Sequence, residues 1–181
     1  MNKKIRWITE TAIMLALLVT LQALTKPMGQ LVTGSCVNAV LAIAALLGGM
    51  GCGVTVAFIS PVLAFLLGIA PQILTVPAIM AGNTVYVVLL SLLADPTGKN
   101  MIKQVIAWLA AAAAKFATLY GIVVGLICGI MSESLLASGA MKAPMLQALP
   151  ATFSWPQLFT ALTGGAVALL IVPVLKKALH K

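Results

Sequence analysis

Apolar stretches of membrane-spanning length follow one another along almost the whole chain, and this pattern restricts the possible folds more than any other feature of the sequence. A helix needs about 20 apolar residues to cross about 30 Å of hydrocarbon. Glycines, prolines and charged residues divide the stretches at intervals that suit six such helices. The predicted spans lie near residues 6–25, 31–47, 52–68, 73–94, 102–130 and 157–178.

The composition excludes a water-soluble domain. Hydrophobic residues make up 62% of the chain and charged residues 8%, whereas soluble domains are about 25% charged. The links between the second, third and fourth spans are only a few residues long, which makes these spans antiparallel neighbours. We therefore predict an all-α integral membrane protein in which residues 1–181 form a single bundle of six transmembrane helices.

The basic residues predict how this bundle is oriented. Lysine and arginine together number 11, against 3 aspartates and glutamates, and most of the basic residues lie at the two ends of the chain or between the fourth and fifth spans. An even number of spans puts these regions on one side of the membrane, with only Lys26 and Lys142 on the other. Because cytoplasmic segments carry the excess of positive charge, both termini are predicted to be cytoplasmic. The same distribution argues against nucleic-acid binding.

The longest predicted connection, residues 132–156, then lies outside the cell. Long connections often have a function, so this one is a candidate lid. A passive loop that Trp155 anchors at the membrane surface is equally compatible with the sequence.

Catalysis and metal binding find no support in the sequence. The three cysteines lie in apolar stretches without a neighbouring histidine, since the single histidine is His180 near the C-terminus. Histidine pairs, clusters of carboxylates, nucleotide-binding loops and hydrolase motifs are absent from the sequence. We predict no enzyme, no metal site and no bound cofactor, so any active transport would need an ATP-hydrolysing partner or a coupled ion.

Lys115 is the most informative single residue, because a cation near the middle of a span costs at least about 2.5 kcal/mol. It lies roughly 12 residues into the fifth span, close to the midplane. Glu10 is the only acidic residue within a span, and it lies too near the membrane surface to pair with Lys115. The lysine could receive an anionic group of a ligand, or it could extend to the surface or bond backbone carbonyls at a helix break. The sequence leaves both interpretations open.

Other polar side chains lie at a similar depth or nearer the outside. Asn83 reaches about the depth of Lys115, and Tyr86 follows three residues later on the same helix face. Further uncharged polar residues in the outer halves of the spans are Gln22, Asn38, Gln72, Thr160 and Thr163. This distribution is typical of an outward-opening pocket with apolar walls and a few polar groups. Separate hydrogen bonds between helices would produce it as well.

Small residues at four-residue spacing form two stripes, and such stripes let membrane helices pack closely. Ala12 and Ala16 begin one stripe in the first span, for which docking onto another membrane protein and packing within the bundle are about equally favoured. The second stripe follows the fifth span and consists of Ala113, Ala117, Gly121, Gly125 and Gly129. Because the length of the fifth span suits a central position, we expect the second stripe to pack inside the bundle.

The chain resembles the substrate-binding S components of energy-coupling factor (ECF) transporters, which are small vitamin-uptake proteins of bacteria. The resemblance rests on the length of 181 residues, the six hydrophobic spans, the basic N-terminus that runs straight into the first span, and an Ala-x-x-x-Ala motif at Ala12 and Ala16. It implies a multi-pass protein of the bacterial cell membrane that binds a vitamin or related micronutrient from outside with high affinity. It also implies docking through the first helix onto a transmembrane coupling protein with two ATPase subunits, whose ATP hydrolysis reorients the S component.

The resemblance further implies where the substrate binds. In this family the outer loops and the outer parts of helices four to six hold the ligand, and in this sequence those parts contain Asn83, Tyr86, Tyr120 and Thr163. The polar pattern of the spans adds Asn38 and Lys115 to the predicted site. Lys115 favours a small-molecule substrate that bears a carboxylate.

Two other functions stay open. A self-sufficient secondary transporter or channel normally has ion-coupling carboxylates in its spans and often internal repeats, and the sequence shows neither. A structural membrane protein of a cell-envelope assembly would bind no ligand and would tolerate the loss of Lys115 or Asn83.

Overall fold

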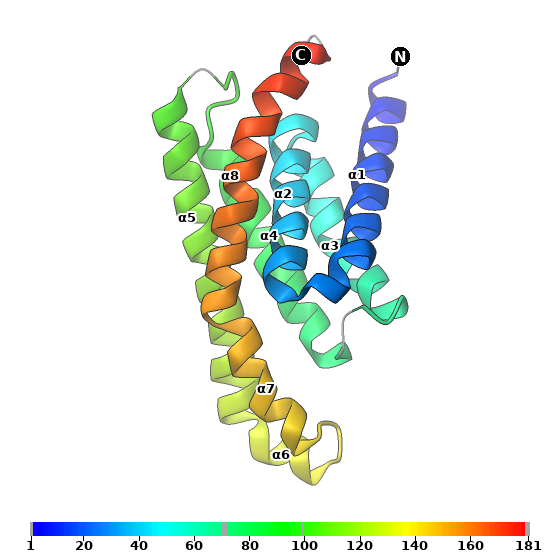
Figure 1. Ribbon diagram of the computed structural model, residues 1–181, viewed down its shortest axis with the longest axis vertical. Helices are drawn as coiled ribbons and strands as arrows, with labels where there is room; N and C mark the ends of the chain where they lie inside the picture. The colour runs from blue at the N-terminus through cyan, green and yellow to red at the C-terminus, as the bar shows by residue number, and fades with distance from the viewer. Residues whose placement is uncertain (1, 70–71, 99, 180–181) are drawn as a thin grey trace.

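The computed structural model describes residues 2–69, 72–98 and 100–179, and all regular secondary structure in these ranges is helical (Figure 1). The α-helices are α1 (Lys3–Thr25), α2 (Gln30–Gly48), α3 (Met50–Leu66), α4 (Val76–Leu93), α5 (Met101–Leu119), α6 (Ser132–Ala137), α7 (Ala143–Phe153) and α8 (Trp155–Ala178). The 3₁₀ helices η1 (Lys26–Met28) and η2 (Ile73–Thr75) precede α2 and α4, and the π-helix η3 (Tyr120–Ile130) continues α5.

Five of the described helical stretches are long and apolar enough to cross a membrane. They are Lys3–Met28, Gln30–Gly48, Ile73–Leu93, Met101–Ile130 and Trp155–Ala178. Each coincides with a predicted span to within a few residues, which confirms the expectation of an all-helical, multi-pass membrane protein. The predicted span at 52–68 corresponds to α3, a shorter apolar helix of 17 residues.

Glycines in the left-handed region make two of the tight links possible. Gly29, with a φ of 91°, precedes α2, and Gly49, with a φ of 85°, separates α2 from α3. A side chain at such a φ would be strained, whereas glycine adopts it without steric cost. Gly49 is the whole link between two helices, so α2 and α3 pack as antiparallel neighbours.

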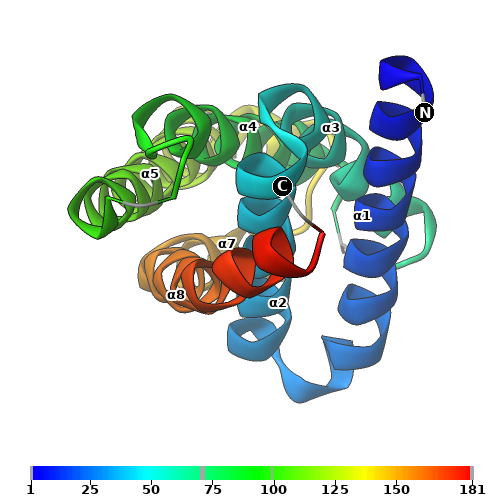
Figure 2. The same ribbon diagram turned by 90° about the horizontal axis from the view of Figure 1, so that it is seen from above.

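The central helix of the bundle is α2. Figure 2 shows it surrounded by α1, α3, α4 and α8, and its residues 38–45 are buried without interruption. The expectation that the fifth span is central is wrong, because α5 packs on α4 and α8 at one side of the bundle.

The most extensive contact in the bundle joins α2 and α8. A Cβ atom on Gly164 would lie 2.4 Å from the carbonyl oxygen of Ser35, and one on Gly34 would lie 2.7 Å from Thr160 Cγ2. Only glycine permits this approach of one helix to the other. The approach brings Asn38 of α2 within hydrogen-bonding distance of Thr160 of α8, at 3.2 Å.

Gly164→Ala is expected to destabilise the bundle by about 1–3 kcal/mol, because the added methyl group meets backbone atoms of α2. The measurement is the melting temperature of the purified protein in mild detergent. Gly121→Ala is the matched control, since a Cβ atom at this position meets nothing within 4 Å. Equal melting temperatures for the two variants would show that the α2–α8 contact accommodates the added methyl group without loss of stability.

Residues 132–156 are not the loop that the sequence predicts, because they form α6, α7 and the first residues of α8. Apolar side chains recur in α7 at helical spacing, and Leu149 and Phe153 pack in one buried cluster with residues of η3. Figure 1 shows η3, α6 and α7 extending past the other helices at the end opposite to the termini. Trp155 stacks on Phe116 of α5 with 5.6 Å between ring centroids, which braces the corner between α7 and α8.

The small-residue stripe of the fifth span was expected to pack inside the bundle, but it lies on the surface. All five of its residues are exposed, and a Cβ atom on Gly121 or Gly125 would meet nothing within 4 Å. The buried face of α5 is a different one and carries Ala107, Ala111 and Lys115.

Candidate functional site

A cavity of about 430 Å³ lies between the helices. Its lining includes the link from α1 to α2, which Figure 1 shows at the end of these helices opposite to the termini. The cavity is bounded by this link, by α4 and α5, and by α7. Its volume is within the range of small-molecule sites, about 300–1,000 Å³. Apolar residues of its wall include Val37, Ile79, Leu119, Leu149 and Phe153.

Lys115, from the middle of the Met101–Ile130 span, lies at the inner end of this cavity and is 3% exposed. Its Nζ donates hydrogen bonds to Asn38 Oδ1 of α2 at 2.5 Å and to Asn83 Oδ1 of α4 at 2.6 Å. The same Nζ lies 5.5 Å from the ring centroid of Tyr86, where the π-face attracts a cation. Lys115 therefore turns into the bundle rather than toward the membrane surface, and it joins three of the residues that the sequence places in the site.

Asn38 is fixed by hydrogen bonds from both ends of its amide group. Its Nδ2 donates to Gly34 O at 2.9 Å and to Thr160 Oγ1 at 3.2 Å. Thr160 in turn donates to Gln157 O at 3.1 Å, so its hydroxyl presents a lone pair to Asn38. Because both amide hydrogens have acceptors, the carbonyl oxygen of Asn38 is held toward Lys115.

Asn83 differs from Asn38 in one respect that matters for binding. Its Oδ1 accepts from Lys115, but its Nδ2 makes no hydrogen bond to any residue in the described ranges. The side chain lines the cavity, so the amide N–H groups can reach a ligand. Lys115 has three N–H donors and uses two of them on the asparagines, which leaves it one donor as well.

Tyr86 supports Lys115 from behind and does not line the cavity. It is completely buried, and its hydroxyl donates to Ala161 O of α8 at 3.3 Å. A Cβ atom on Gly165 would lie 2.8 Å from this hydroxyl oxygen, so the glycine makes room for the tyrosine. Tyr86 therefore contacts Lys115 and not the cavity, and the direct ligand contact that the sequence predicts stays a prediction.

The lining of the cavity is positively charged, and no carboxylate belongs to it. The three acidic residues of the chain, Glu10, Asp95 and Glu133, lie elsewhere in the fold. A second lysine of the described lining, Lys26, lies at the mouth, where its Nζ donates to Gly68 O at 2.6 Å. This contact ties the link after α1 to the link after α3. In a site of low dielectric, the unneutralised charge of Lys115 attracts anions strongly.

The helix α7 covers the cavity on one side. Gln72 Nε2, from the segment before α4, contacts Met145 Sδ of α7 at 2.8 Å. At the far end of α7, Gln157 Nε2 donates to Thr152 O at 3.1 Å, and all four of these residues line the cavity. The segment that the sequence predicts as a lid, residues 132–156, therefore contributes to the wall of the cavity. Its movement stays a prediction.

Two predicted site residues, Tyr120 and Thr163, lie outside the cavity. Tyr120 is 46% exposed and packs its ring on Phe116. Five residues separate it from Lys115, which is about 140° around a helix of 3.6 residues per turn. Thr163 is exposed and donates to Phe159 O of its own helix. Neither side chain lines the cavity that contains Lys115.

Several residues of the wall were not predicted from the sequence. Thr33, Thr75 and Gln157 line the cavity together with Phe153. The hydroxyls of Thr33 and Thr75 donate to backbone carbonyls, as threonines in lipid-facing positions also do. Their direction depends on packing between helices, so no local pattern distinguishes them.

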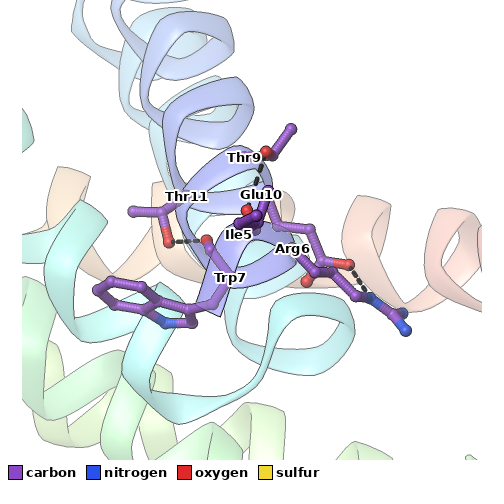
Figure 3. Close-up of polar contacts among 6 residues, drawn as sticks. All are labelled: Ile5, Arg6, Trp7, Thr9, Glu10 and Thr11. Atoms are coloured by element: carbon purple, nitrogen blue, oxygen red, sulfur yellow. Dashed lines mark hydrogen bonds and ion pairs between the residues drawn. The ribbon is translucent and has the colours of Figure 1, made fainter. Parts of the chain in front are cut away.

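Ala12 and Ala16, the predicted docking residues, lie on the exposed side of α1. This helix buries only Thr11 and Leu18. Figure 3 shows that polar groups near its start are satisfied within the helix: Arg6 pairs with Glu10 at 3.0 Å, and the hydroxyls of Thr9 and Thr11 donate to the carbonyls of Ile5 and Trp7. The exposed residues around the two alanines include the large apolar side chains of Ile8, Ile13 and Leu17.

No protein-family model, curated protein or solved structure matches this chain. The function therefore has to be inferred from the cavity, its charge and the exposed face of α1.

Proposed function

We propose that the chain is a membrane-embedded binding protein that captures a small micronutrient of the vitamin class from outside the cell, for ATP-driven uptake through a separate ECF module. The observation that carries the proposal is the cavity itself, an apolar pocket with a lysine and two asparagines at its inner end. A cation buried this deep in a membrane span costs free energy, and ionisable residues in such positions typically serve a function. Solute binding supplies that function.

The proposal includes six spans with both termini in the cytoplasm of a bacterial cell. At 17 residues α3 is at the short end of the range for a membrane-crossing helix, about 17–25 residues. Support for the orientation comes from the basic residues near the termini and the α4–α5 link, which are Lys3, Lys4, Arg6, Lys103, Lys176 and Lys177. Lys176 Nζ donates to Pro96 O at 3.1 Å, which joins the end of α8 to that link. The positive-inside rule then makes this end cytoplasmic and turns the mouth of the cavity outward.

The proposed partners are a transmembrane coupling protein and its two ATPase subunits. The sequence has no nucleotide-binding loop, so in this proposal the partner subunits supply the energy through ATP hydrolysis. The exposed small-residue face at Ala12 and Ala16 supports docking through α1, because small residues let two membrane helices approach closely. The other surfaces of the spans contact membrane lipid.

The two alternative functions have less support. A self-sufficient transporter normally couples solute to ions through carboxylates in its spans, and none lines the cavity in the described ranges. A structural protein without a ligand has no use for a cavity whose inner end keeps a lysine 3% exposed.

Native mass spectrometry of the protein, purified in mild detergent from cells grown in rich medium, is expected to detect a co-purifying small molecule. Ile79→Trp should lower the fraction of protein that carries it at least about tenfold, because the indole fills part of the cavity. Leu92→Trp is the matched control, since Leu92 is on the same helix but does not line the cavity and is 65% exposed at the surface of the bundle.

Two results would contradict the proposed function. One is a protein that carries no small molecule and takes up none from a mixture of vitamins. The other is a bound molecule that Ile79→Trp leaves fully in place, because such a molecule would occupy a different site.

A further inference from the structure

We propose that the ligand is a small monocarboxylate with an apolar body, and that it enters the cavity with its carboxylate first. One carboxylate oxygen accepts from Lys115 Nζ and the other from Asn83 Nδ2. This inference rests on the proposed function, solute binding in the cavity, and specifies the chemical class of the solute.

The inner end of the cavity offers hydrogen-bond donors to a ligand. Both asparagine carbonyl oxygens already accept from Lys115, at 2.5 Å and 2.6 Å. The amide hydrogens of Asn38 are taken by Gly34 O and Thr160 Oγ1, so Asn38 contributes positioning only. The groups left for a ligand are the third N–H of Lys115 and the amide N–H groups of Asn83. A ligand group that only accepts hydrogen bonds matches them, and an ionised carboxylate is such a group.

The number of donors favours a carboxylate over a phosphate. Two neighbouring donor groups, one of them charged, match the two oxygens of a carboxylate, and charge-assisted hydrogen bonds of this kind are the strong ones. A phosphate group would bring three oxygens and up to two negative charges. The second lysine of the lining, Lys26, is exposed at the mouth and already donates to Gly68 O, so it does not complete a phosphate site at the inner end.

Charge leads to the same class of ligand. Lys115 is buried with amide oxygens but without a carboxylate partner, and amides do not neutralise its charge. A monoanion brings the inner end to neutrality, whereas a neutral solute leaves the charge unpaired and a cationic solute is repelled. The rest of the ligand then contacts the apolar wall formed by Val37, Ile79, Leu119 and Phe153, which favours an apolar body over a second charged group.

The test compares acids with uncharged counterparts of nearly the same shape on the unmodified protein. The probes are nicotinate with nicotinamide and lipoate with lipoamide, each measured by native mass spectrometry and by thermal stabilisation in detergent. We expect at least one acid to bind and its counterpart to bind at least about 30-fold more weakly, since the counterpart leaves Lys115 unpaired. Equal affinity within each pair would overturn the inference.

A variant of the recognising amide gives a second measurement. Asn83→Asp is nearly isosteric and supplies Lys115 with an internal counter-ion, so it should lower the affinity for the bound acid at least about 30-fold and leave the weak binding of the counterpart unchanged. Asn100→Asp is the matched control, because Asn100 lies outside the cavity at the start of α5 and an aspartate can cap this helix equally well. An acid that binds Asn83→Asp as tightly as the unmodified protein would also overturn the inference.

The outcomes separate this inference from the proposed function. If a neutral or cationic molecule co-purifies and Ile79→Trp displaces it, the cavity binds solutes but the carboxylate assignment is wrong. If none of the acids binds and nothing co-purifies, the proposed function fails together with the inference.

Discussion

Lys115→Met is expected to lower the affinity for the anionic solute at least about 100-fold, which corresponds to about 2.8 kcal/mol. The methionine side chain has a similar length, but it removes the positive charge and the donor that one carboxylate oxygen needs. The partner carboxylate would then be buried beside amide groups only, and loss of one member of a buried charge pair typically costs about 2–5 kcal/mol. Equilibrium dialysis of the purified protein with the radiolabelled solute measures the effect.

Lys103→Met is the control for the loss of a lysine from the same helix. Lys103 is exposed near the start of α5 and does not line the cavity, so its removal should leave the affinity within about twofold of the unmodified protein. The melting temperature of both variants shows whether they are folded. A folded Lys115→Met protein with unchanged affinity would mean that the solute does not contact the ammonium group.

The sequence predicted the fold at the level of helices because the membrane leaves few choices. Each apolar stretch must form a helix to satisfy its backbone hydrogen bonds, and the glycines and prolines mark where helices end. The link between α2 and α3 is an example. Gly48, Gly49 and Gly51 predict a break between two spans, and the structure turns there at Gly49. Residues 132–156 were predicted as a loop because polar residues interrupt the segment. The helical spacing of Leu149 and Phe153, which pack in one buried cluster, is therefore difficult to recognise in the sequence.

Which helix is central could not be predicted from helix lengths. Burial of α2 depends on two single glycines on different helices: Gly34 of α2 lies against Thr160 of α8, and Gly164 of α8 lies against Ser35 of α2. A regular stripe of small residues, as on the fifth span, is easier to see in a sequence but lies on the surface here. Close packing in this bundle depends on pairing between distant positions, which a single sequence does not display.

Depth along each span predicted part of the site. The sequence places Asn83 at the depth of Lys115 and Asn38 in the outer half of its span, and the three side chains meet at the inner end of the cavity. Depth says nothing about rotation around a helix axis, and for this reason Tyr120 and Thr163 fall outside the cavity while Gln157 lines it. The rotation of each helix is fixed by contacts with its neighbours, such as the hydrogen bond from Tyr86 to Ala161.

Replacing both Ala12 and Ala16 by tryptophan is expected to lower solute uptake at least about tenfold without changing solute affinity, because bulky side chains prevent the close approach of another membrane helix. Both alanines are exposed on α1, and neither lines the cavity. The coupling protein and ATPase subunits should also fail to co-purify with this variant. Uptake of labelled solute by cells that contain the complete transporter is measured together with equilibrium binding to the purified chain.

Ala117→Trp is the informative comparison, since it places a tryptophan on the second exposed stripe of small residues, on α5. If α1 is the docking helix, this variant transports solute normally, because its indole lies in lipid. Loss of uptake in Ala117→Trp and normal uptake in the α1 variant would instead assign docking to α5. Normal uptake and normal co-purification in both variants would contradict docking through either stripe, and the proposal that the chain works with an ECF module would then lose the surface on which it depends.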